Sequence, residues 1–267
     1  MKTTIQLYDN LRQKVQFLYT RLKLERREKV KGRKLSIPIV DIITLSLFKQ
    51  KNHIATKKSV FEIFDPPCSY KTLVVNMNRF VKLALTLFTF VLNLNRASPH
   101  SIKHTDSTDI PVCSNRKAKQ HKTMQGLAQW GTTRKGSFYG LKLHITTDLK
   151  RKLLSVRFTG GNVDDRKIFM KLNKGLFGIF VADAGYVSQK LQDEFYVQHQ
   201  RILFAKPRKN MKRIITAFDY HLYNTRVLIE LNFRSLKMFY GLVTSMPRSV
   251  NGYLANYIYS LLAYILA

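Results

Sequence analysis

The first hundred residues carry hydrophobic side chains at the spacing of amphipathic helices. The clearest stripe recurs every three or four positions and consists of Leu7, Leu11, Val15, Leu18 and Leu22. This spacing predicts a helix with one apolar face. A second helix is expected over 37–48, and a long apolar helix over 71–94 follows the Asp-Pro-Pro break at 65–67. Residues 1–100 are therefore expected to form an all-helical region.

After residue 100 the pattern changes to short runs of β-branched and aromatic residues. These runs predict strands over 104–112, 138–147, 153–159, 179–182 and 202–205. Helical patterns alternate with them over 164–174, 188–199 and 222–239. Neighbouring strands joined by short turns, followed by strand–helix units, indicate a mixed sheet flanked by helices. We therefore expect an α/β domain over residues 101–267.

Two segments are apolar enough to raise the question of a membrane span. Segment 80–94 contains Lys82, and segment 253–267 contains two polar residues. Each falls short of the roughly 20 apolar residues that a spanning helix needs, so we expect two buried helices and no membrane association. The first thirty residues are charged throughout, and Cys68 and Cys113 are too few for a disulfide framework. These features predict a cytoplasmic protein.

The net charge of the chain narrows the range of functions that fit this sequence. The 267 residues include 46 Lys and Arg against 16 Asp and Glu, a formal net charge of +30. With 45% hydrophobic residues the chain has material for a core, which excludes a disordered basic tail. So large an excess of positive charge favours a polyanionic partner, most often nucleic acid. Basic connections between the predicted helices suit a helix-turn-helix-like DNA-binding module, although other helical bundles share this pattern.

Three carboxylates lie on apolar elements, where an unpaired charge costs several kcal/mol. Asp106 lies in the first predicted strand, Asp183 ends the apolar run 179–182, and Glu230 lies in an apolar helical stretch. The carboxyl end of a strand is the usual position for a functional group in an open α/β sheet. If these three carboxylates converge on one point, only hard divalent cations such as Mg²⁺ or Mn²⁺ can bind all of them there. Two such ions would support in-line displacement at phosphorus.

The predicted helix around Glu230 also carries groups that suit phosphate. Tyr223, Arg226 and Lys237 lie on the same helical face as Glu230 and are expected to hold DNA phosphates. An ordinary structural interpretation stays open for each carboxylate. Arg226 and Glu230 form an exposed i,i+4 pair in that interpretation, and Asp106 and Asp183 are turn residues.

Further candidates lie on the predicted strands. Lys142 and His144 alternate on one strand, so they share a face and are expected to approach DNA or the carboxylates. A packed histidine is an equal alternative for His144. Asp109 faces away from Asp106 and is a reserve ligand only, whereas Asp164 or its neighbour Asn162 is expected to cap the following helix. No His and Cys spacing suits zinc.

Two acid-free basic segments complete the pattern. One covers 114–136 and includes Trp130, and the other surrounds residue 207 and includes Arg208 and Lys209. Such runs are solvated faces in many proteins, but their position beside the predicted site favours contact with DNA. Trp130 would stack on an exposed base or anchor its loop, and the sequence does not decide between these.

The order of these motifs resembles a known family. Tyr223-x2-Arg226-x3-Glu230-x6-Lys237 reproduces the Tyr-Arg-Glu-Lys pattern of DDE transposases of the IS4 kind. The surrounding sequence is similar to the IS982 insertion-sequence transposases. The blocks that carry this resemblance are Asp106–Thr108, Pro111–Asn115, Phe138–His144, Gly160–Lys167, Ala182–Tyr186 and Lys206–Lys212. One position departs from the family, which usually has Lys or Arg where this chain has Ala184, and this removes one phosphate contact.

The resemblance implies an RNase H-like fold and a bacterial DNA transposase. In that family Asp106, Asp183 and Glu230 would bind two Mg²⁺ ions, or Mn²⁺, and catalyse cleavage and strand transfer at insertion-sequence ends. It also implies a helical end-binding region, a homodimer that joins two ends, and double-stranded DNA as partner, both as terminal inverted repeats and as target. Two alternatives are a catalytically impaired DNA-binding remnant and an RNase H-like nuclease without strand transfer.

Overall fold

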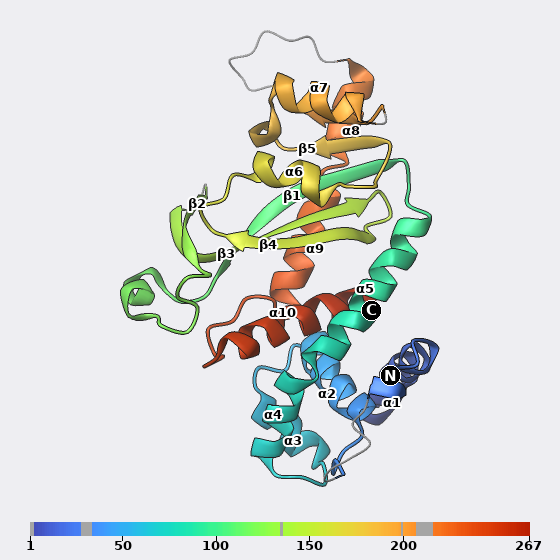
Figure 1. Cartoon of the computed structure of the whole chain (residues 1–267), viewed down its shortest axis with the longest axis vertical. Coiled ribbons are helices and arrows are strands. Elements are labelled where there is room, and N and C mark those ends of the chain that lie inside the picture. The colour runs from blue at the N-terminus through green and yellow to red at the C-terminus, as the bar shows by residue number, and fades with distance from the viewer. Residues whose placement is uncertain (1–2, 28–33, 134–135, 199, 207–215) are drawn as a thin grey trace. The chain divides into compact units, whose positions relative to one another are not determined.

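The structure is a computed structural model, and it describes residues 3–27, 34–133, 136–198, 200–206 and 216–267 (Figure 1). The chain divides into two compact units. One comprises Met1–Val91 with Ser235–Ala267, and the other comprises Leu92–Arg234. The predicted fold class, a mixed sheet flanked by helices after an all-helical N-terminal region, is confirmed. The functional division into residues 1–100 and 101–267 stays a prediction, and the last 33 residues group with the helical unit.

The first unit is built from helices, several of which begin at a side-chain cap. Its elements are α1 (Thr4–Arg21), a short 3-10 helix (Leu24–Arg27), α2 (Ile39–Lys51), α3 (Lys57–Phe64), α4 (Tyr70–Arg79), most of α5 (Val81–Ala97) and α10 (Val250–Ile265). Thr56, Ser69 and Ser249 each accept a hydrogen bond from a backbone N–H in the first turn of α3, α4 and α10. Such caps satisfy amides that have no partner inside the helix.

Helix α2 forms the centre of this unit. It packs against α1, α3, α4 and α10, and ten of its residues are buried. Its two buried hydroxyls, on Thr44 and Ser46, donate to the carbonyl oxygens of Val40 and Ile42 one turn earlier. These two hydroxyls are therefore satisfied within the helix, which lets them lie in the core.

The predicted single helix over 71–94 is wrong, because the chain forms two helices there. Helices α4 and α5 meet at Phe80 with a bend of 44°. Phe80 leaves helical geometry at ψ 9° and packs against the apolar cluster around α2 and α4. Tertiary burial thus overrides local helix propensity. No single helix in the described part of the chain is long and apolar enough to span a membrane, and α4 and α5 pass that test only as a bent pair.

The second unit contains a six-stranded mixed sheet. Its strands are β1 (Ile102–Pro111), β2 (Gln129–Thr133), β3 (Gly136–Asp148), β4 (Leu153–Gly160), β5 (Ile179–Ala182) and β6 (Ile202–Ala205). The long strand β3 runs antiparallel to β1 on one side and to β2 and β4 on the other. Strands β1, β5 and β6 are parallel to one another. Strand β2 was not predicted and lies inside the basic segment 114–136.

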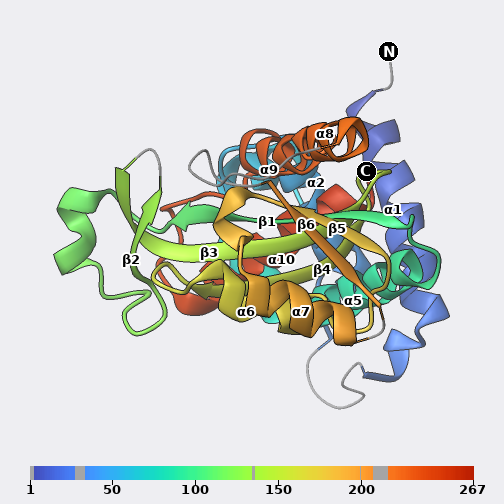
Figure 2. The same cartoon turned by 90° about the horizontal axis from the view of Figure 1, so that it is seen from above.

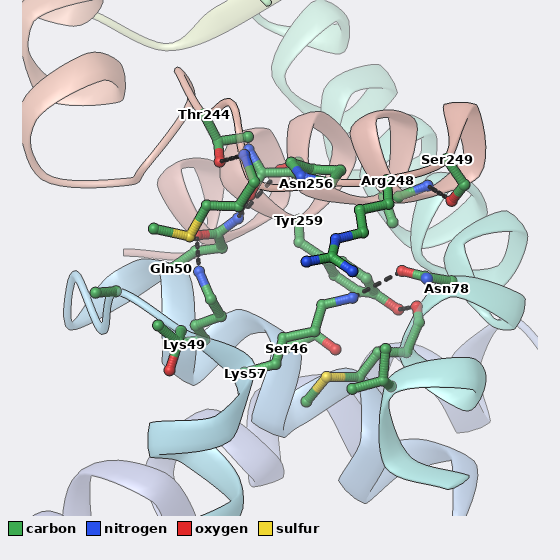
Figure 3. A pocket seen from close by; sticks show the side chains of 18 of the residues that line it. Ser46, Lys49, Gln50, Lys57, Asn78, Thr244, Arg248, Ser249, Asn256 and Tyr259 are labelled. Atoms are coloured by element: carbon green, nitrogen blue, oxygen red, sulfur yellow. Dashed lines mark hydrogen bonds between the residues drawn. The ribbon is translucent and has the colours of Figure 1, made fainter. Parts of the chain in front are cut away.

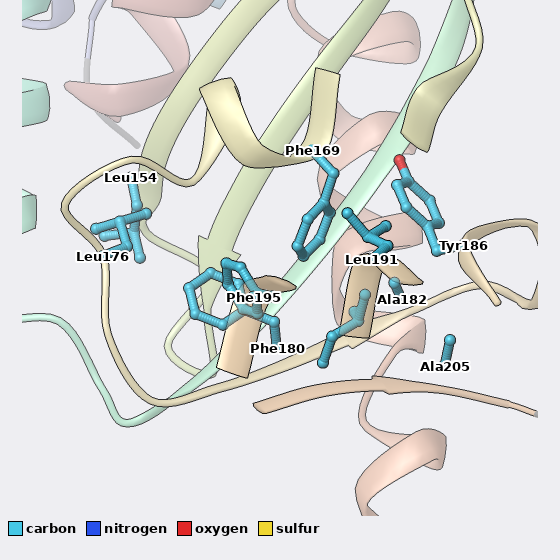
Figure 4. Packing of buried hydrophobic residues seen from close by; sticks show 10 residues of the cluster. Leu154, Phe169, Leu176, Phe180, Ala182, Tyr186, Leu191, Phe195 and Ala205 are labelled. Carbon is cyan, nitrogen blue, oxygen red and sulfur yellow. The ribbon is translucent and has the colours of Figure 1, made fainter. Parts of the chain in front are cut away.

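Helices cover both faces of this sheet. Helices α6 (Asp165–Leu172) and α7 (Gln189–Val197) lie on one face, and α8 (Ala217–Asn224) with the start of α9 (Val227–Met238) lies on the other (Figure 2). Aromatic rings fill the layer under α6 and α7 (Figure 4). The ring centroid of Phe195 lies 4.9 Å from that of Phe169 and 5.0 Å from that of Phe180. Edge-to-face packing of this kind fixes the strands that carry the site.

The contact between β1 and β3 leaves no room for a side chain at Gly140. A Cβ atom there would lie 2.1 Å from the carbonyl oxygen of Ile110, which belongs to the backbone and cannot rotate away. Gly140→Ala is therefore expected to lower the free energy of unfolding by about 1 to 3 kcal/mol, measured by urea denaturation. Gly185→Ala is the control, because a Cβ atom there meets nothing within 4 Å. Equal stability of the two variants would contradict the close approach of β1 and β3.

Candidate active site

Two aspartates lie next to each other where the parallel pairing of β1 and β5 ends. The register places Thr105 opposite Ala182. Asp106 and Asp183 are the next residues on the two chains, so the strand backbone alone brings them together. The expectation that Asp183 follows a buried strand is confirmed, because three of the four β5 residues are buried. This end of a parallel strand pair is where open α/β folds place functional groups.

A break between α8 and α9 brings further groups to these aspartates. The predicted continuous helix over 222–239 is wrong, because the chain turns at Thr225 and Arg226. The Thr225 hydroxyl donates to the carbonyl oxygen of Leu222 at 2.6 Å, a local bond that competes with helical hydrogen bonding. The hydroxyl oxygen of Thr225 also lies 2.8 Å from Nε2 of His104 on β1. The turn is therefore tied to the strand that carries Asp106.

The guanidinium of Arg226 lies among three carboxylates. Its Nη2 is 3.1 Å from Oδ2 of Asp106 and 3.9 Å from Oδ2 of Asp183. Its Nη1 donates to Oε1 of Glu230. Each of the three acids therefore contacts Arg226, a cation that the protein itself supplies, whereas their role as metal ligands stays a prediction.

Both aspartates are oriented by the backbone amide that follows them. Ser107 N donates to Oδ1 of Asp106 at 2.8 Å, and Ala184 N donates to Oδ1 of Asp183 at 2.7 Å. Each carboxylate thus uses one oxygen for its own backbone and directs the other towards Arg226. Ala184, the position that departs from the IS982 pattern, contributes this amide, which any residue except proline would supply.

The negative charge of the buried Asp106 carboxylate is only partly offset by its surroundings. Its side chain is 15% exposed, and burial raises the pKa of Asp106 to about 7. Arg226 and the Ser107 amide oppose that rise, while the charges of Asp183 and Asp165 add to it. Burial alone would lower the pKa of Arg226, but Asp106, Asp183 and Glu230 together raise it. The site therefore holds more negative charge than one guanidinium satisfies.

The raised pKa of Asp106 predicts that the metal-free protein loses stability as pH rises. Between the unfolded pKa near 3.8 and the folded pKa near 7, the folded state holds a proton that the unfolded state has released. The free energy of unfolding then falls by up to about 1.4 kcal/mol per pH unit, and the loss is complete above pH 7. Urea denaturation at several pH values, with a chelator present, measures this slope.

Comparing the pH profiles of the wild type and Asp106→Asn isolates the contribution of the Asp106 carboxyl group. The asparagine does not titrate, so the variant is expected to lose less stability than the wild type between pH 4 and pH 7. Other titrating groups contribute to both proteins and cancel in the difference. Parallel pH profiles would show that the Asp106 carboxyl group titrates normally in the folded chain.

A fourth carboxylate near the site was not identified from the sequence. Asp165, in the first turn of α6, accepts a hydrogen bond from Lys142 Nζ at 3.2 Å, and its Oδ1 lies 3.7 Å from Nδ1 of His144. Its neighbour Asp164 caps α6 by accepting from Arg166 N, as predicted. Only the tertiary structure shows the role of Asp165, because Lys142 and His144 come from a strand about twenty residues earlier.

Lys142 and His144 share a face of β3, as expected, and both contact Asp165. The His144 side chain is 1% exposed, and its Nε2 lies 2.8 Å from the hydroxyl oxygen of Thr159. Burial lowers the pKa of His144 to about 4, which leaves its ring neutral at pH 7. These facts agree with the packed-histidine alternative, and contact of Lys142 and His144 with DNA stays a prediction.

The remaining predicted phosphate-binding residues lie on or near α8 and α9. Tyr223 is in the last turn of α8, with the ammonium of Lys206 4.6 Å from its ring centroid. Lys237 is in the last turn of α9, seven residues after Glu230. Arg208 and Lys209 lie outside the described residues. Their contacts with DNA are not tested by the structure and stay predictions.

Trp130 lies on β2, opposite Tyr139 of β3. The two ring centroids are 5.6 Å apart, so Trp130 packs on the sheet, yet 48% of its surface is exposed. Both interpretations of this residue therefore have a structural basis, because one ring face anchors the strand pair while the exposed part is free to meet a base.

The carboxylate oxygens of Asp106, Asp183 and Glu230 are ligands that suit a divalent cation. Their present arrangement, however, is not that of a metal centre. Among the residues that the structure describes, no three His, Cys, Asp or Glu side chains are placed to hold a metal ion. Arg226 lies among the three carboxylates instead. Carboxylate oxygens are the preferred ligands of Mg²⁺, and the raised pKa of Asp106 shows that further positive charge would be accommodated. The residues present therefore fit such an ion.

Comparison of the sequence with protein families shows the family of the chain. A family model described as "Transposase DDE domain" matches residues 96–250, more than half of the chain. The chain belongs to the DDE transposase family. The matched span contains all three carboxylates and the turn that carries Arg226. DDE transposases use divalent metal ions, which agrees with the donor set. Among curated proteins, no sequence matches this transposase.

The fold of the transposase is similar to that of a solved transposase structure. The piggyBac transposase in a synaptic complex with hairpin DNA aligns with a TM-score of 0.50 and 11% identity, over 94% of this chain and 71% of that one. The Mos1 mariner paired-end complex with Mn aligns at 11% identity over 92% and 83%, with a TM-score of 0.27. The sheet order and flanking helices of this transposase make the fold RNase H-like, as predicted.

Proposed function

We propose that this DDE transposase is an insertion-sequence transposase of the IS982 kind that cleaves and joins DNA by in-line phosphoryl transfer. The observation that carries the proposal is the convergence of Asp106, Asp183 and Glu230 around one cation. Charged groups this close require positive charge between them, and phosphoryl transfer requires positive charge at the reacting phosphate.

Asp106, Asp183 and Glu230 would hold two Mg²⁺ ions, or Mn²⁺, in the active protein. When bound, these ions activate a water or a 3′-hydroxyl group and stabilise the leaving oxygen. The Ser107 and Ala184 amides fix the two aspartates, so that the oxygens facing Arg226 are the ones available as ligands. Arg226 partly offsets the charge of the carboxylates in the metal-free chain and would donate to a DNA phosphate once they bind metal.

The remaining basic and hydroxyl groups would bind the DNA backbone on either side of the reacting phosphate. The residues proposed for this role are Tyr223, Lys237, Lys142, His144, Arg208 and Lys209. The formal net charge of +30 supplies the long-range attraction that phosphate contacts need. Binding is therefore expected to weaken steeply with salt.

The partners follow from this reaction. Double-stranded DNA serves both as the terminal inverted repeats and as the target, and residues 1–100 bind the ends. A homodimer would hold two ends together, since both must be joined to one target. The protein would act at the nucleoid in the bacterial cytoplasm, with no membrane partner.

The test uses the full chain, Mg²⁺ and a labelled duplex that carries the DNA flanking its own gene. A supercoiled plasmid provides the target. Strand cleavage at the element boundary followed by joining to the plasmid supports the proposal. Cleavage without joining favours an RNase H-like nuclease, and salt-sensitive binding without cleavage favours a catalytically impaired remnant.

A further inference from the structure

The helical unit contains a cavity of about 400 Å³ that belongs to none of the proposed catalytic residues (Figure 3). Its walls come from α2, α3, α4, the segment before α10 and the first turns of α10. Hydrogen bonds between these elements hold it open. Gln50 Nε2 donates to Oδ1 of Asn256 at 2.7 Å, and the Tyr259 hydroxyl donates to the carbonyl oxygen of Met77 at 2.9 Å. The cavity is therefore preformed.

Three cationic side chains line this cavity, and no Asp or Glu does among the described residues. They are Lys49, Lys57 and Arg248. Lys57 and Arg248 point into the space from α3 and from the segment before α10 (Figure 3). The Lys57 ammonium donates to Oδ1 of Asn78 at 2.7 Å, and that of Lys49 lies 3.5 Å from Oε1 of Gln50, at the limit of a hydrogen bond. An ammonium has three donors, so each lysine retains donors for a ligand.

The charge in the cavity is not compensated by the protein. Burial and, to a smaller extent, the nearby charge of Lys49 lower the pKa of Lys57 to about 8. Burial also lowers the pKa of Lys49. A folded protein gains nothing from holding two such cations together, whereas an anion between them would relieve their desolvation and repulsion.

The N-terminus of α10 adds a partial positive charge to the same wall. This helix is 16 residues long, and Arg248, Ser249 and Gly252 at its start line the cavity. The Ser249 hydroxyl accepts from Gly252 N at 3.1 Å, which leaves amides earlier in the first turn for another acceptor. Helix N-termini and ammonium groups together are a common environment for phosphate.

The rest of the cavity is apolar and larger than a phosphate group needs. Tyr70, Val74, Met77, Met246 and Pro247 line it. Its volume lies within the range of about 300 to 1,000 Å³ that is typical of sites for small organic ligands. A ligand that suits both the cationic and the apolar side of the cavity would carry two groups. One is an anionic group that contacts the lysines, and the other is a flat apolar group that packs against the tyrosine and methionines.

We propose that this cavity binds a nucleotide, with the phosphate at Lys49, Lys57 and Arg248 and the base against Tyr70 and Met77. A free mononucleotide and one nucleotide of a single-stranded DNA share this chemistry. The site goes beyond the proposed function, because the three carboxylates take no part in it. Binding of the nucleotide is non-covalent and needs no metal.

The test compares Lys57→Gln with the matched control Lys58→Gln. Lys58 is the next residue on α3, but its side chain is 70% exposed and lies 3.6 Å from Glu62, away from the cavity. Calorimetry with dAMP, inorganic phosphate, adenosine and a mixed-sequence single-stranded oligonucleotide measures binding. Lys57→Gln is expected to weaken nucleotide binding by about tenfold or more, since a hydrogen bond to a charged group is lost. Lys58→Gln should change it by less than about twofold.

Acetylation of the wild-type protein gives a second measurement that needs no variant. The bound nucleotide is expected to slow the acetylation of Lys57 and to leave that of Lys58 unchanged, with both sites read by peptide mass spectrometry. Protection by dAMP but not by the oligonucleotide identifies a free nucleotide, and the reverse identifies a DNA strand. No protection by either probe, or protection of Lys58 alone, overturns the proposal.

Asp183→Asn should bind dAMP like the wild type, which separates this site from the proposed chemistry.

Discussion

Asp183→Asn is expected to lower the rate of Mg²⁺-dependent cleavage of transposon-end DNA by about a thousandfold or more. The substitution removes a negative charge from the proposed ligand set and keeps the size of the side chain. Loss of several kcal/mol of metal-based stabilisation corresponds to such a factor. Cleavage of a labelled duplex measures the rate, and a gel-shift assay in the same buffer is expected to show that DNA binding persists.

Asp109→Asn provides the matched control for this result. Asp109 lies on β1 three residues after Asp106, so its side chain points to the opposite face of the strand. Its pairing partner on β3 is Lys142, whereas Asp106 lies beside Ile145. The control should cleave at a rate close to that of the wild type. Cleavage that survives in Asp183→Asn, or that is lost equally in Asp109→Asn, would refute the assignment of the carboxylates.

Arg226→Gln is expected to destabilise the metal-free protein by about 3 kcal/mol at pH 8, where the nearby carboxylates are ionised. The variant leaves Asp106, Asp183 and Glu230 facing one another without a cation. Mg²⁺ should restore more stability to this variant than to the wild type, because Arg226 no longer competes for the same oxygens. Urea denaturation with chelator or with saturating Mg²⁺ measures both effects.

Arg166→Gln tests whether the effect is specific to this cluster. Arg166 also forms an ion pair, with Asp164 at 2.8 Å, but that pair is about 40% exposed on each side. Exposed ion pairs contribute at most about 1 kcal/mol, so the control should lose little stability and gain nothing extra from Mg²⁺. If Mg²⁺ stabilises Arg226→Gln and the wild type equally, the guanidinium and the metal do not share a site.

The positions of most strands in the second unit followed from local patterns. The runs over 179–182 and 202–205 correspond residue for residue to β5 and β6. Both are short apolar segments bounded by turn residues, a pattern that is typical of strands. Strand β2 was missed because Gln129–Thr133 contains few apolar residues and lies at the edge of the sheet. Its extended conformation comes from its backbone pairing with β3, which the sequence pattern does not reveal.

Helix interruptions could not be predicted in the same way. Two helices that look continuous in the sequence break at Phe80 and at Thr225, with no proline or glycine at either position. In both cases a tertiary contact decides the break: Phe80 packs on the helical core, and the Thr225 hydroxyl meets His104. The second break determines how Arg226 faces the carboxylates.

The sequence by itself determined the fold class and the resemblance to DDE transposases. It also led to the proposal of the three acids, because a basic chain with few carboxylates makes each acid on an apolar element conspicuous. The tertiary structure alone decided what surrounds those acids. It placed Arg226 among them, added Asp165 beside Lys142 and His144, and gathered three cations from separate segments around a cavity. Local periodicity reports which face of an element is buried, whereas charge pairing depends on contacts between residues far apart in the chain.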